Sequence, residues 1–527
     1  MKLKYKVLSL VMFVMLICCV SAASAADVDN ITVPDDTSVI ELDDAVDSVD
    51  AVESDRISDD VATSDDSKVL VTQTRGTVTP TNYGSYFDLS TGYITTTDSN
   101  LVFSGNFDNL NFTTFKINKN VVMDASAATF TNIGFDLQTS NIELNGGTFI
   151  GTNTTTLTSV ISIEGSHVKV NGTTINVSAP SGANFYAFDL ENANYANLVN
   201  NVITYVDKYT NTANYNYVVK IKGGSNNKMV ENNITAFLPL KDVDYSHWTP
   251  EPTIDYDLVA GVAVESSSNF NFTGNKLNVT ANLRAGWYPT LDAMIIVKSD
   301  NVRIIGNEIY EQDVVSGKEE TNYLYAVDIY KCNNLTICSN KIELNSNGGN
   351  LTVNGTGAAY GIQLTGPHTG IIICNNNITT ANNGPNLGIY SQNTQGSTSL
   401  TIYGNRINVT GRAGDNAWAL VSGMELQDSN AEVYNNVINV NNTAGYHAGY
   451  YAFGISYCQS TSGNHYYNIH NNDVTVYNGD YAVYLLNSTY VTGEVKNNNL
   501  IAYMANGTRT GNNAVFAGSG VTVSKNH

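Results

Sequence analysis

Basic residues are scarce in this sequence. Only 14% of the 527 residues are charged, and 26 Lys and Arg are outnumbered by 48 Asp and Glu, which gives a formal net charge of −22. A chain so acidic, without basic patches, is unsuited to nucleic acid, whose phosphates attract Lys and Arg. Glycine-rich phosphate loops and nucleophile elbows are absent as well. We therefore expect no nucleic-acid partner and no nucleotide cofactor.

Cysteine is also rare. Six cysteines occur, and Cys18 and Cys19 belong to the apolar N-terminal segment discussed below. The other four are scattered and lack the Cys-x-x-Cys spacing of a metal site. The sequence therefore predicts neither a metal centre nor a cofactor.

Helical periodicity is missing after the N-terminus, because no stretch keeps a 3.6-residue period long enough for a helix. The apolar run from Val7 to Val20 is short for a membrane span. Lysines precede this run, and the small residues SAASAA follow it. This pattern predicts a Sec-type signal peptide over residues 1–26, and hence an extracellular or cell-surface protein that does not insert into a membrane once the signal is removed.

The segment after the signal changes character abruptly. Residues 27–68 contain 15 Asp and Glu against Arg56 and Lys68, and no aromatic residue. Such a segment repels itself and has little apolar surface to bury. We expect residues 27–70 to form a disordered acidic spacer. It would act as a solvated tether, or alternatively hold the following domain away from a wall or bind cations.

The remaining chain consists of repeats of one short sequence motif, called the phrase below. NVRIIGNEI at Asn301 recurs as NLTICSNKI at Asn334 and as NAEVYNNVI at Asn430. Successive copies lie 26 to 43 residues apart, so each copy is one structural unit with insertions at a loop. Taking the last Asn of the phrase as the marker, the copies fall at Asn201, Asn232, Asn275, Asn307, Asn340, Asn376, Asn405, Asn436, Asn472, Asn498 and Asn526, after weaker copies at Gly147 and Thr173.

The repeating unit is built from strands. The residue three before the marker and the residue two after it are apolar, as Ile304 and Ile309 illustrate, and the residue two before the marker is unrestricted. Upstream lies a second short segment opened by Ala or Gly, such as AVDI at Ala326 and GIQL at Gly361, with alternating apolar residues. A two-residue period indicates strands. The sequence therefore predicts an all-β, single-stranded parallel β-helix (a solenoid) of roughly 14 to 16 coils over residues 71–527.

The marker asparagine is expected at the bend between two strands. There its amide can bond to the same residue one coil above and one coil below, as in the amide ladders of cross-β stacks. The simpler alternative is that Asn is only a good turn former at this position. Both explanations are structural.

The signal peptide, the acidic spacer and the NxxIxxNxI coils together resemble the adhesin-like surface proteins of methanogenic archaea, which are built on right-handed parallel β-helix repeats. The resemblance implies a secreted, cell-surface protein involved in attachment, with right-handed coils. Pectate lyases, polygalacturonases and phage tailspikes resemble the chain at the level of the fold. Longer members have wall-binding or anchoring modules after the coils, and none is visible here.

The coils lengthen at one place, directly after the strand that contains the marker. Three long insertions are Ala236–Asp257, Ala281–Asp292 and Glu311–Tyr323. On stacked coils they should form one ridge of aromatic and acidic side chains, a combination that suits sugar binding. We expect surface glycans or cell-wall polymers of the same or other cells as partners. The candidate ligand residues are Asp242, Asp244, His247, Trp248, Asp255, Asp257, Arg284, Trp287 and Tyr288.

An enzyme would use the same residues. Asp242 with Asp244, or Asp255 with Asp257, could supply the two carboxylates of a glycoside hydrolase, and Arg284 the base of a lyase. The strand motifs expected of polygalacturonase-like proteins are not found in matching coils. A non-catalytic, adhesin-like function is therefore favoured, and a polysaccharide lyase or glycoside hydrolase of the pectate-lyase-like type is the alternative.

Two further expectations concern particular coils. Cys338 and Cys374 both lie two before the marker in consecutive coils, so they should be outward neighbours, either as a disulfide or as two surface thiols. The final coil places Asn526 on the marker and stops one residue later, without an atypical cap. This predicts either a truncated family member or another chain stacked on the open C-terminal coil.

We predict that the mature protein begins at Ala26 or Asp27 and has no lipid, because the best small-residue cleavage site lies beyond Cys18 and Cys19. N-terminal sequencing and intact mass of secreted protein test this. A chain that still begins at Met1, or a lipidated cysteine, would show that the segment is not a cleaved signal.

Overall fold

The computed structural model divides the chain into Met1–Gln73 and Thr74–His527, and only residues of the second unit are described here. The expected signal peptide and spacer (1–26 and 27–70) therefore lie outside the described residues. Among these, no helix has the length and apolar character that crossing a bilayer requires. The described residues are 74–152, 157–180, 184–208, 216–242, 254, 259–284, 289–314, 323–346, 358–392, 399–414, 420–427, 430–445, 451–458, 464–486, 489–504 and 507–527.

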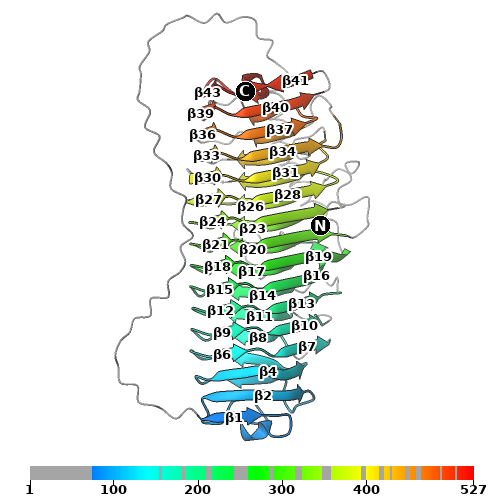
Figure 1. Ribbon diagram of the computed structural model, residues 1–527, viewed down its shortest axis with the longest axis vertical. Coiled ribbons are helices and arrows are strands. Elements are labelled where there is room, and N and C mark those ends of the chain that lie inside the picture. Colours follow the sequence, from blue (N-terminus) through cyan, green and yellow to red (C-terminus); the bar gives the residue numbers. More distant parts are fainter. Residues whose placement is uncertain are drawn as a thin grey trace, which may run out of the picture. The chain divides into compact units, whose positions relative to one another are not determined.

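Almost all regular structure in Thr74–His527 is β-strand, and each strand pairs in parallel with the equivalent strand of the next coil (Figure 1). Most coils have three strands, so the strands form three columns. The chain passes through the first, second and third column in turn and then enters the next coil. The unit is a right-handed parallel β-helix. Its handedness is the one that connections between parallel strands of a sheet almost always have. The predicted fold class is confirmed.

The first column contains the segments opened by Ala or Gly. Its strands are β3 (Thr114–Ile117), β5 (Gly134–Leu137), β8 (Ser159–Ile163), β11 (Tyr186–Glu191), β14 (Asn216–Lys222), β17 (Val259–Glu265), β20 (Pro289–Val297), β23 (Tyr323–Tyr330), β26 (Ala359–Thr365), β29 (Asn386–Gln392), β32 (Val421–Gln427), β35 (Ala452–Tyr457), β38 (Tyr481–Leu485) and β42 (Val515–Phe516).

The second column contains the residues just before the marker. Its strands are β1 (Arg75–Val78), β6 (Glu143–Asn145), β9 (Lys169–Asn171), β12 (Asn197–Val199), β15 (Lys228–Val230), β18 (Asn271–Thr273), β21 (Arg303–Ile305), β24 (Thr336–Cys338), β27 (Ile371–Cys374), β30 (Ser399–Tyr403), β33 (Asn430–Tyr434), β36 (His465–His470), β39 (Val491–Lys496) and β43 (Val521–Ser524).

The third column follows the marker. Its strands are β7 (Thr148–Thr152), β10 (Thr174–Ser178), β13 (Val202–Val206), β16 (Asn233–Asp242), β19 (Lys276–Arg284), β22 (Glu308–Asp313), β25 (Lys341–Ser346), β28 (Asn377–Asn382), β31 (Arg406–Gly411), β34 (Val437–Asn442), β37 (Asp473–Tyr477) and β40 (Asn499–Met504).

The first coils and the last one depart from this plan. Two long strands, β2 (Asn100–Phe107) and β4 (Val122–Thr131), span the second and third columns together. With them the second column has 16 strands and the first has 14 among the described residues, in agreement with the predicted 14 to 16 coils. The short elements are η1 (Tyr83–Ser85), β41 (Gly507–Thr510) and η3 (Gly511–Ala514).

Apolar side chains from all three columns fill the interior. The Ala or Gly that opens most first-column strands is explained by this packing. A Cβ on Gly423 would lie 2.3 Å from Ile438 Cγ2 and 2.6 Å from the carbonyl oxygen of Gly454. Only a very small residue fits where the first column approaches the apolar side chains of the third.

The marker asparagines form a buried ladder. Asn340 Nδ2 donates to Asn376 Oδ1 (3.0 Å) and to the carbonyl oxygen of Ile304 in the preceding coil (2.8 Å). Asn340 Oδ1 accepts the backbone N–H and the Nδ2 of Asn307, both at 2.9 Å. The same pattern runs from Asn201 to Asn526. The predicted ladder is confirmed, and the asparagines are therefore more than turn formers.

The residue before each marker has a left-handed backbone, a feature that the sequence reasoning missed. Its φ is 53° at Asn200, 66° at Gly306 and 53° at Asn375. Glycine and asparagine tolerate this conformation best, which explains the many Asn-Asn and Gly-Asn pairs at the marker.

The last coil is not the ordinary repeat that the sequence predicted. Strand β41 folds back antiparallel on β40, and η3 places Asn512 at the end of the ladder. Asn526 donates from Nδ2 (2.8 Å) and from its backbone N–H (3.2 Å) to Asn512 Oδ1. The predicted absence of a cap-like feature is thus wrong, because Asn512 supplies one further rung.

We predict that Asn340→Ala lowers the free energy of unfolding by roughly 3 kcal/mol or more, because the carbonyl of Ile304 and two donors of Asn307 lose their partner inside the protein. The matched control is Asn345→Ala, whose exposed side chain belongs to β25 in the same coil, five residues further along the chain. Chemical denaturation with hydrogen exchange measures both. Equal stability of the two variants would contradict a structural role for the ladder.

Candidate functional site

Most of the ridge predicted from the sequence cannot be placed. Seven of its residues lie outside the described residues: Asp244, His247, Trp248, Asp255, Asp257, Trp287 and Tyr288. Asp242 ends β16, and Arg284 ends β19. The two strands pair so that Leu240 is opposite Arg284, and Asp242 pairs antiparallel with Pro289 of β20. The backbones of Asp242 and Arg284 therefore meet at the corner between the third and first columns.

One of the predicted insertions is mostly strand. Residues Ala281–Arg284 extend β19, and Pro289–Asp292 begin β20. Ala281 and Leu291 are fully buried and continue the inward alternation of these strands. The prediction of a loop over Ala281–Asp292 is wrong over most of its length for this reason.

Ile254 is the one residue between β16 and β17 that the structure describes, and it packs on the outer face of the first column. It is buried against Ala260, Ala263 and Ile295. The hydroxyl of Tyr217 donates to the carbonyl oxygen of Ile254. The outer face of the first column is defined here by two rows of outward residues that are in register from coil to coil.

The first outward row reads Asp189, Lys220, Ala263, Ile295, Asp328, Gln363, Tyr390, Glu425, Ser456, Tyr484 and Phe516. The second outward row reads Tyr217, Ala260, Asp292, Tyr325, Tyr360, Leu387, Ser422, Phe453 and Tyr481.

Tyrosines on this face stack on one another between coils. The ring centroids of Tyr325 and Tyr360 are 5.0 Å apart with planes 12° from parallel, and Tyr390 meets Tyr360 edge-on at 5.6 Å. All three side chains are half-buried. We call Tyr325, Tyr360 and Tyr390 the tyrosine strip. Stacking fixes the rings while part of each surface stays open.

Amide and carboxyl groups flank the tyrosine strip. Gln363 Nε2 donates to Asp328 Oδ1 at 3.2 Å, and Gln427 Nε2 donates to Glu425 Oε1 at 2.5 Å. The hydroxyl of Tyr390 donates to Gln427 Oε1 at 3.4 Å. The face therefore combines aromatic rings with hydrogen-bonding groups whose positions are set by the sheet.

Burial favours the protonated form of several carboxyl groups here. Burial raises the pKa of Asp328 to about 7 and that of Glu425 to about 7. The pKa of Asp292 lies well above its usual range because of burial first, and then because of Asp328 and Glu311. Among the described residues, no group of three or more His, Cys, Asp or Glu is arranged to hold a metal ion.

Glu311 is an acid inside the solenoid. It takes an inward position of the third column between Val279 and Leu344 and is 1% exposed. Burial, followed by the neighbouring Asp313, raises its pKa well above the usual range. Glu311 was predicted to belong to a solvent-exposed insertion, but β22 extends through Asp313 and makes it part of the core.

A disulfide joins Cys338 to Cys374, whose Cα atoms are 4.6 Å apart in the paired strands β24 and β27. The register agrees with the sequence expectation. Both cysteines occupy outward positions, in register with the half-buried Ile305 and Tyr403, as expected. The bonded side chains are nevertheless only 8% and 6% exposed, so they are not surface thiols. Cys332 is buried and forms no disulfide, and burial raises the pKa of its thiol to about 12.

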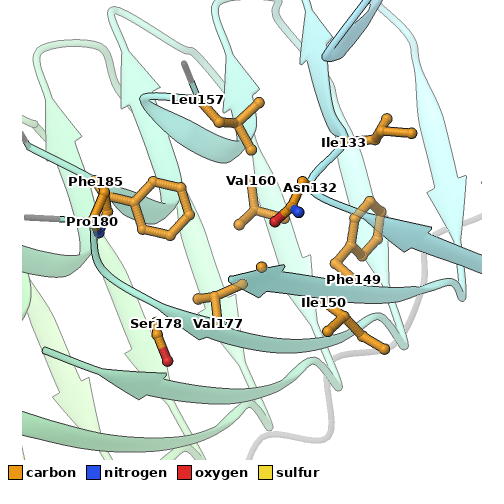
Figure 2. A pocket seen from close by; sticks show the side chains of 11 residues that line it. Asn132, Ile133, Phe149, Ile150, Leu157, Val160, Val177, Ser178, Pro180 and Phe185 are labelled. Atoms are coloured by element: carbon orange, nitrogen blue, oxygen red, sulfur yellow. The ribbon is translucent and has the colours of Figure 1, made fainter. Parts of the chain in front are cut away.

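A separate apolar gap lies at the corner between the third and first columns near β7 and β10 (Figure 2). Leu157, Val160, Val177 and Phe185 are among its lining side chains. Its volume is about 10 Å³, no more than one water molecule occupies. This gap is a packing defect and not a ligand site.

The sequence contained a signal for the outer face that was not used. The third residue of each Ala- or Gly-opened segment is the first outward row, and it is Asp in AVDI, Gln in GIQL and Tyr in AVYL. Comparing this third residue from repeat to repeat would have shown that Asp328, Gln363 and Tyr484 belong to one line of polar and aromatic side chains.

The sequence matches no protein-family model and no curated protein. Among solved structures, the periplasmic alginate epimerase AlgG is similar over 80% of this chain and 83% of its own, with 10% identity and a TM-score of 0.38. The Streptococcus pneumoniae surface protein and adhesin PfbA is similar over 81% and 90%, with 11% identity and a TM-score of 0.39. The Dettilon tailspike protein is similar over 72% and 68%, with 14% identity and a TM-score of 0.31. Likenesses this distant decide nothing about function, and the fold rests on the strand pairing.

We predict that stability falls as pH rises from about 4 to about 7. The folded protein keeps protons on Asp328 and Glu425 up to pH about 7, whereas the unfolded chain loses them near pH 4. The contribution of these two protonated groups to the free energy of unfolding is complete below pH 4 and is lost above pH 7. It amounts to roughly 3 kcal/mol per group.

Denaturant unfolding between pH 4 and 8 measures this slope. Glu425→Gln should flatten it, because an amide mimics the protonated acid, whereas the exposed Glu164→Gln should leave it unchanged. A slope that is identical in Glu425→Gln and in the unmodified protein would show that Glu425 is ionised in the fold.

Proposed function

We propose that this protein is a secreted, cell-surface binding protein of the adhesin-like kind that holds a linear polysaccharide along the outer face of its first column. The observation that supports the proposal most is the tyrosine strip, which runs across β23, β26 and β29 with the half-buried Gln363 beside it. Aromatic faces with a few placed polar groups are what a sugar-binding surface needs.

The geometry suits a chain rather than a single sugar. The three tyrosines come from three consecutive coils, which lie about 4.8 Å apart, so the strip offers contacts in the direction of the coil stack. The rings are already ordered by contact with one another, as in the pair Tyr325 and Tyr360. Binding therefore loses little side-chain entropy, which favours affinity.

Export is supported by two independent features. The N-terminal segment has the pattern of a secretory signal, and the disulfide between Cys338 and Cys374 is typical of oxidising compartments outside the cytosol. Surface glycans or cell-wall polymers, of the same or of other cells, are the partners that this location would offer.

A second candidate function is polysaccharide cleavage by a lyase or glycoside hydrolase. It is favoured by the raised pKa values of Asp292 and Asp328 in adjacent first-column strands, because a general acid must keep its proton near neutral pH. Both acids are almost fully buried, however, with exposures of 1% and 5%. An acid that substrate cannot reach serves stability, so we rank catalysis second.

We predict that Tyr360→Ala weakens binding of the polysaccharide that a glycan array identifies by roughly 5- to 10-fold, because one stacking surface is lost. The control is Tyr503→Ala, which removes one ring of the stacked pair Tyr477 and Tyr503 on the outer face of the third column. Isothermal titration on both variants gives the affinities. Equal loss in the two variants would place the ligand elsewhere.

An activity assay with the polysaccharide that the protein binds distinguishes a binding protein from an enzyme that cleaves it. Incubation with the protein should release neither new reducing ends nor unsaturated uronates. Turnover that disappears in Asp328→Asn would make the protein an enzyme and overturn the proposed function, whatever the binding result.

A further inference from the structure

We propose a second saccharide-binding site, on the outer face of the second column, which takes a neutral oligosaccharide. The site is a surface groove of about 410 Å³ across β30, β33 and β36, three strands that lie one above another in Figure 1. Its main polar and aromatic lining residues are Thr401, Asn430, Glu432, Tyr466 and Asn468. It is built from other strands than the tyrosine strip and does not depend on the function proposed for that face.

The groove is formed by outward side chains in register. Thr401, Glu432 and Asn468 occupy one row of paired positions on the three strands. The backbone N–H of Tyr466 donates to Asn430 Oδ1 at 3.0 Å, which sets the start of β36 against β33. Thr401 and Asn468 are half-buried, while Glu432 is exposed. The floor is therefore part of the rigid sheet.

Tyr466 supplies an aromatic platform. Its side chain is 49% exposed although neighbouring Tyr467 is fully buried in the core. A large ring held at the wall of a polar groove offers a stacking face for a pyranose ring. Volumes of about 300 to 1,000 Å³ are usual for small-ligand sites, and this groove falls within that range.

Hydrogen-bonding groups lie beside the platform. Glu432 Oε1 accepts from Asn468 Nδ2 at 3.4 Å and lies 3.5 Å from His470 Nε2. These contacts are long and partly exposed, so a sugar hydroxyl can compete for them. A carboxylate and an amide side by side can accept from and donate to adjacent hydroxyls.

Stacked rings border the groove on the same strands. Tyr403 and Tyr434 stack with centroids 5.1 Å apart, and Tyr434 and His470 with centroids 5.2 Å apart, at 8° and 4° from parallel. They stand two residues beyond Thr401, Glu432 and Asn468. This stack holds His470 next to Glu432.

The charges select the ligand class. The carboxylate of Glu432 is paired with His470, and Glu494 in the next coil is paired with Lys496. Among the described residues, no Lys or Arg lines the groove, so a phosphate or a polyuronate would find no cation from that part of the chain. The apolar lining residues that the structure describes, Leu400 and Ala431, are buried and offer no pocket for a peptide side chain. A neutral saccharide fits best.

The test uses the full secreted chain and three neutral probes: maltohexaose, cellohexaose and chitohexaose. At least one probe should bind, and Tyr466→Ala and Asn468→Ala should each weaken that binding about tenfold or more. Tyr503→Ala, on the outer face of the third column, should leave it within twofold. Melting temperatures equal to that of the unmodified protein show that the variants fold.

Two results would overturn the proposal. One is that none of the three probes binds the unmodified protein. The other is that binding survives in Tyr466→Ala and Asn468→Ala but is lost in Tyr360→Ala, which would assign the saccharide to the first column alone. Loss in Tyr466→Ala with binding retained in Tyr360→Ala supports the second site even if the first-column function fails.

Discussion

The buried amide of the marker asparagine is the interaction on which the rest of this structure depends. Each coil buries an apolar face that is stable only against its neighbours, and the backbone must turn sharply between the second and third columns. Asn340 satisfies the polar groups at that turn by binding the coil below and the coil above at once. Because the ladder repeats this geometry in every coil, insertions of any length at the other corners leave the register unchanged.

Strict register has a functional consequence. When every coil turns at the same place, one outward position in the sequence becomes one line of side chains along the stack. The groove beside Tyr466 has a floor that arises in this way. The tyrosine strip uses two neighbouring outward positions, with Tyr325 and Tyr360 in the second outward row and Tyr390 in the first. Both need no special backbone geometry, only the right residues at outward positions of three consecutive coils. Such surfaces can be gained or lost by few substitutions, because the interior that maintains the fold is untouched.

The fold could be predicted almost completely, because the inward residues and the marker are constrained by packing that repeats in each coil. Ile304 and Ile309 had to be apolar, and their spacing shows the strands directly. The predicted ligand ridge stays a prediction, because most of its residues lie outside the described part of the chain. Asp292 and Glu311 were taken for loop residues although their strands continue. From the sequence, a carboxyl group in a strand is expected to face solvent. It becomes neutral only because the folded structure buries it, and the sequence pattern does not show that burial. The rung supplied by Asn512 breaks the repeat and therefore had no pattern to reveal it.

A crystal structure of the protein with a bound oligosaccharide from the polysaccharide that it recognises tests the central claim most directly. The account predicts sugar rings on the outer face of the first column, in contact with Tyr360 and within hydrogen-bond distance of Gln363. It also predicts that the saccharide extends from coil to coil, in contact with Tyr325 in the coil before Tyr360 and with Tyr390 in the coil after it. A saccharide bound only to the third column or to the ends of the coil stack, with the tyrosine strip unoccupied, would contradict the account.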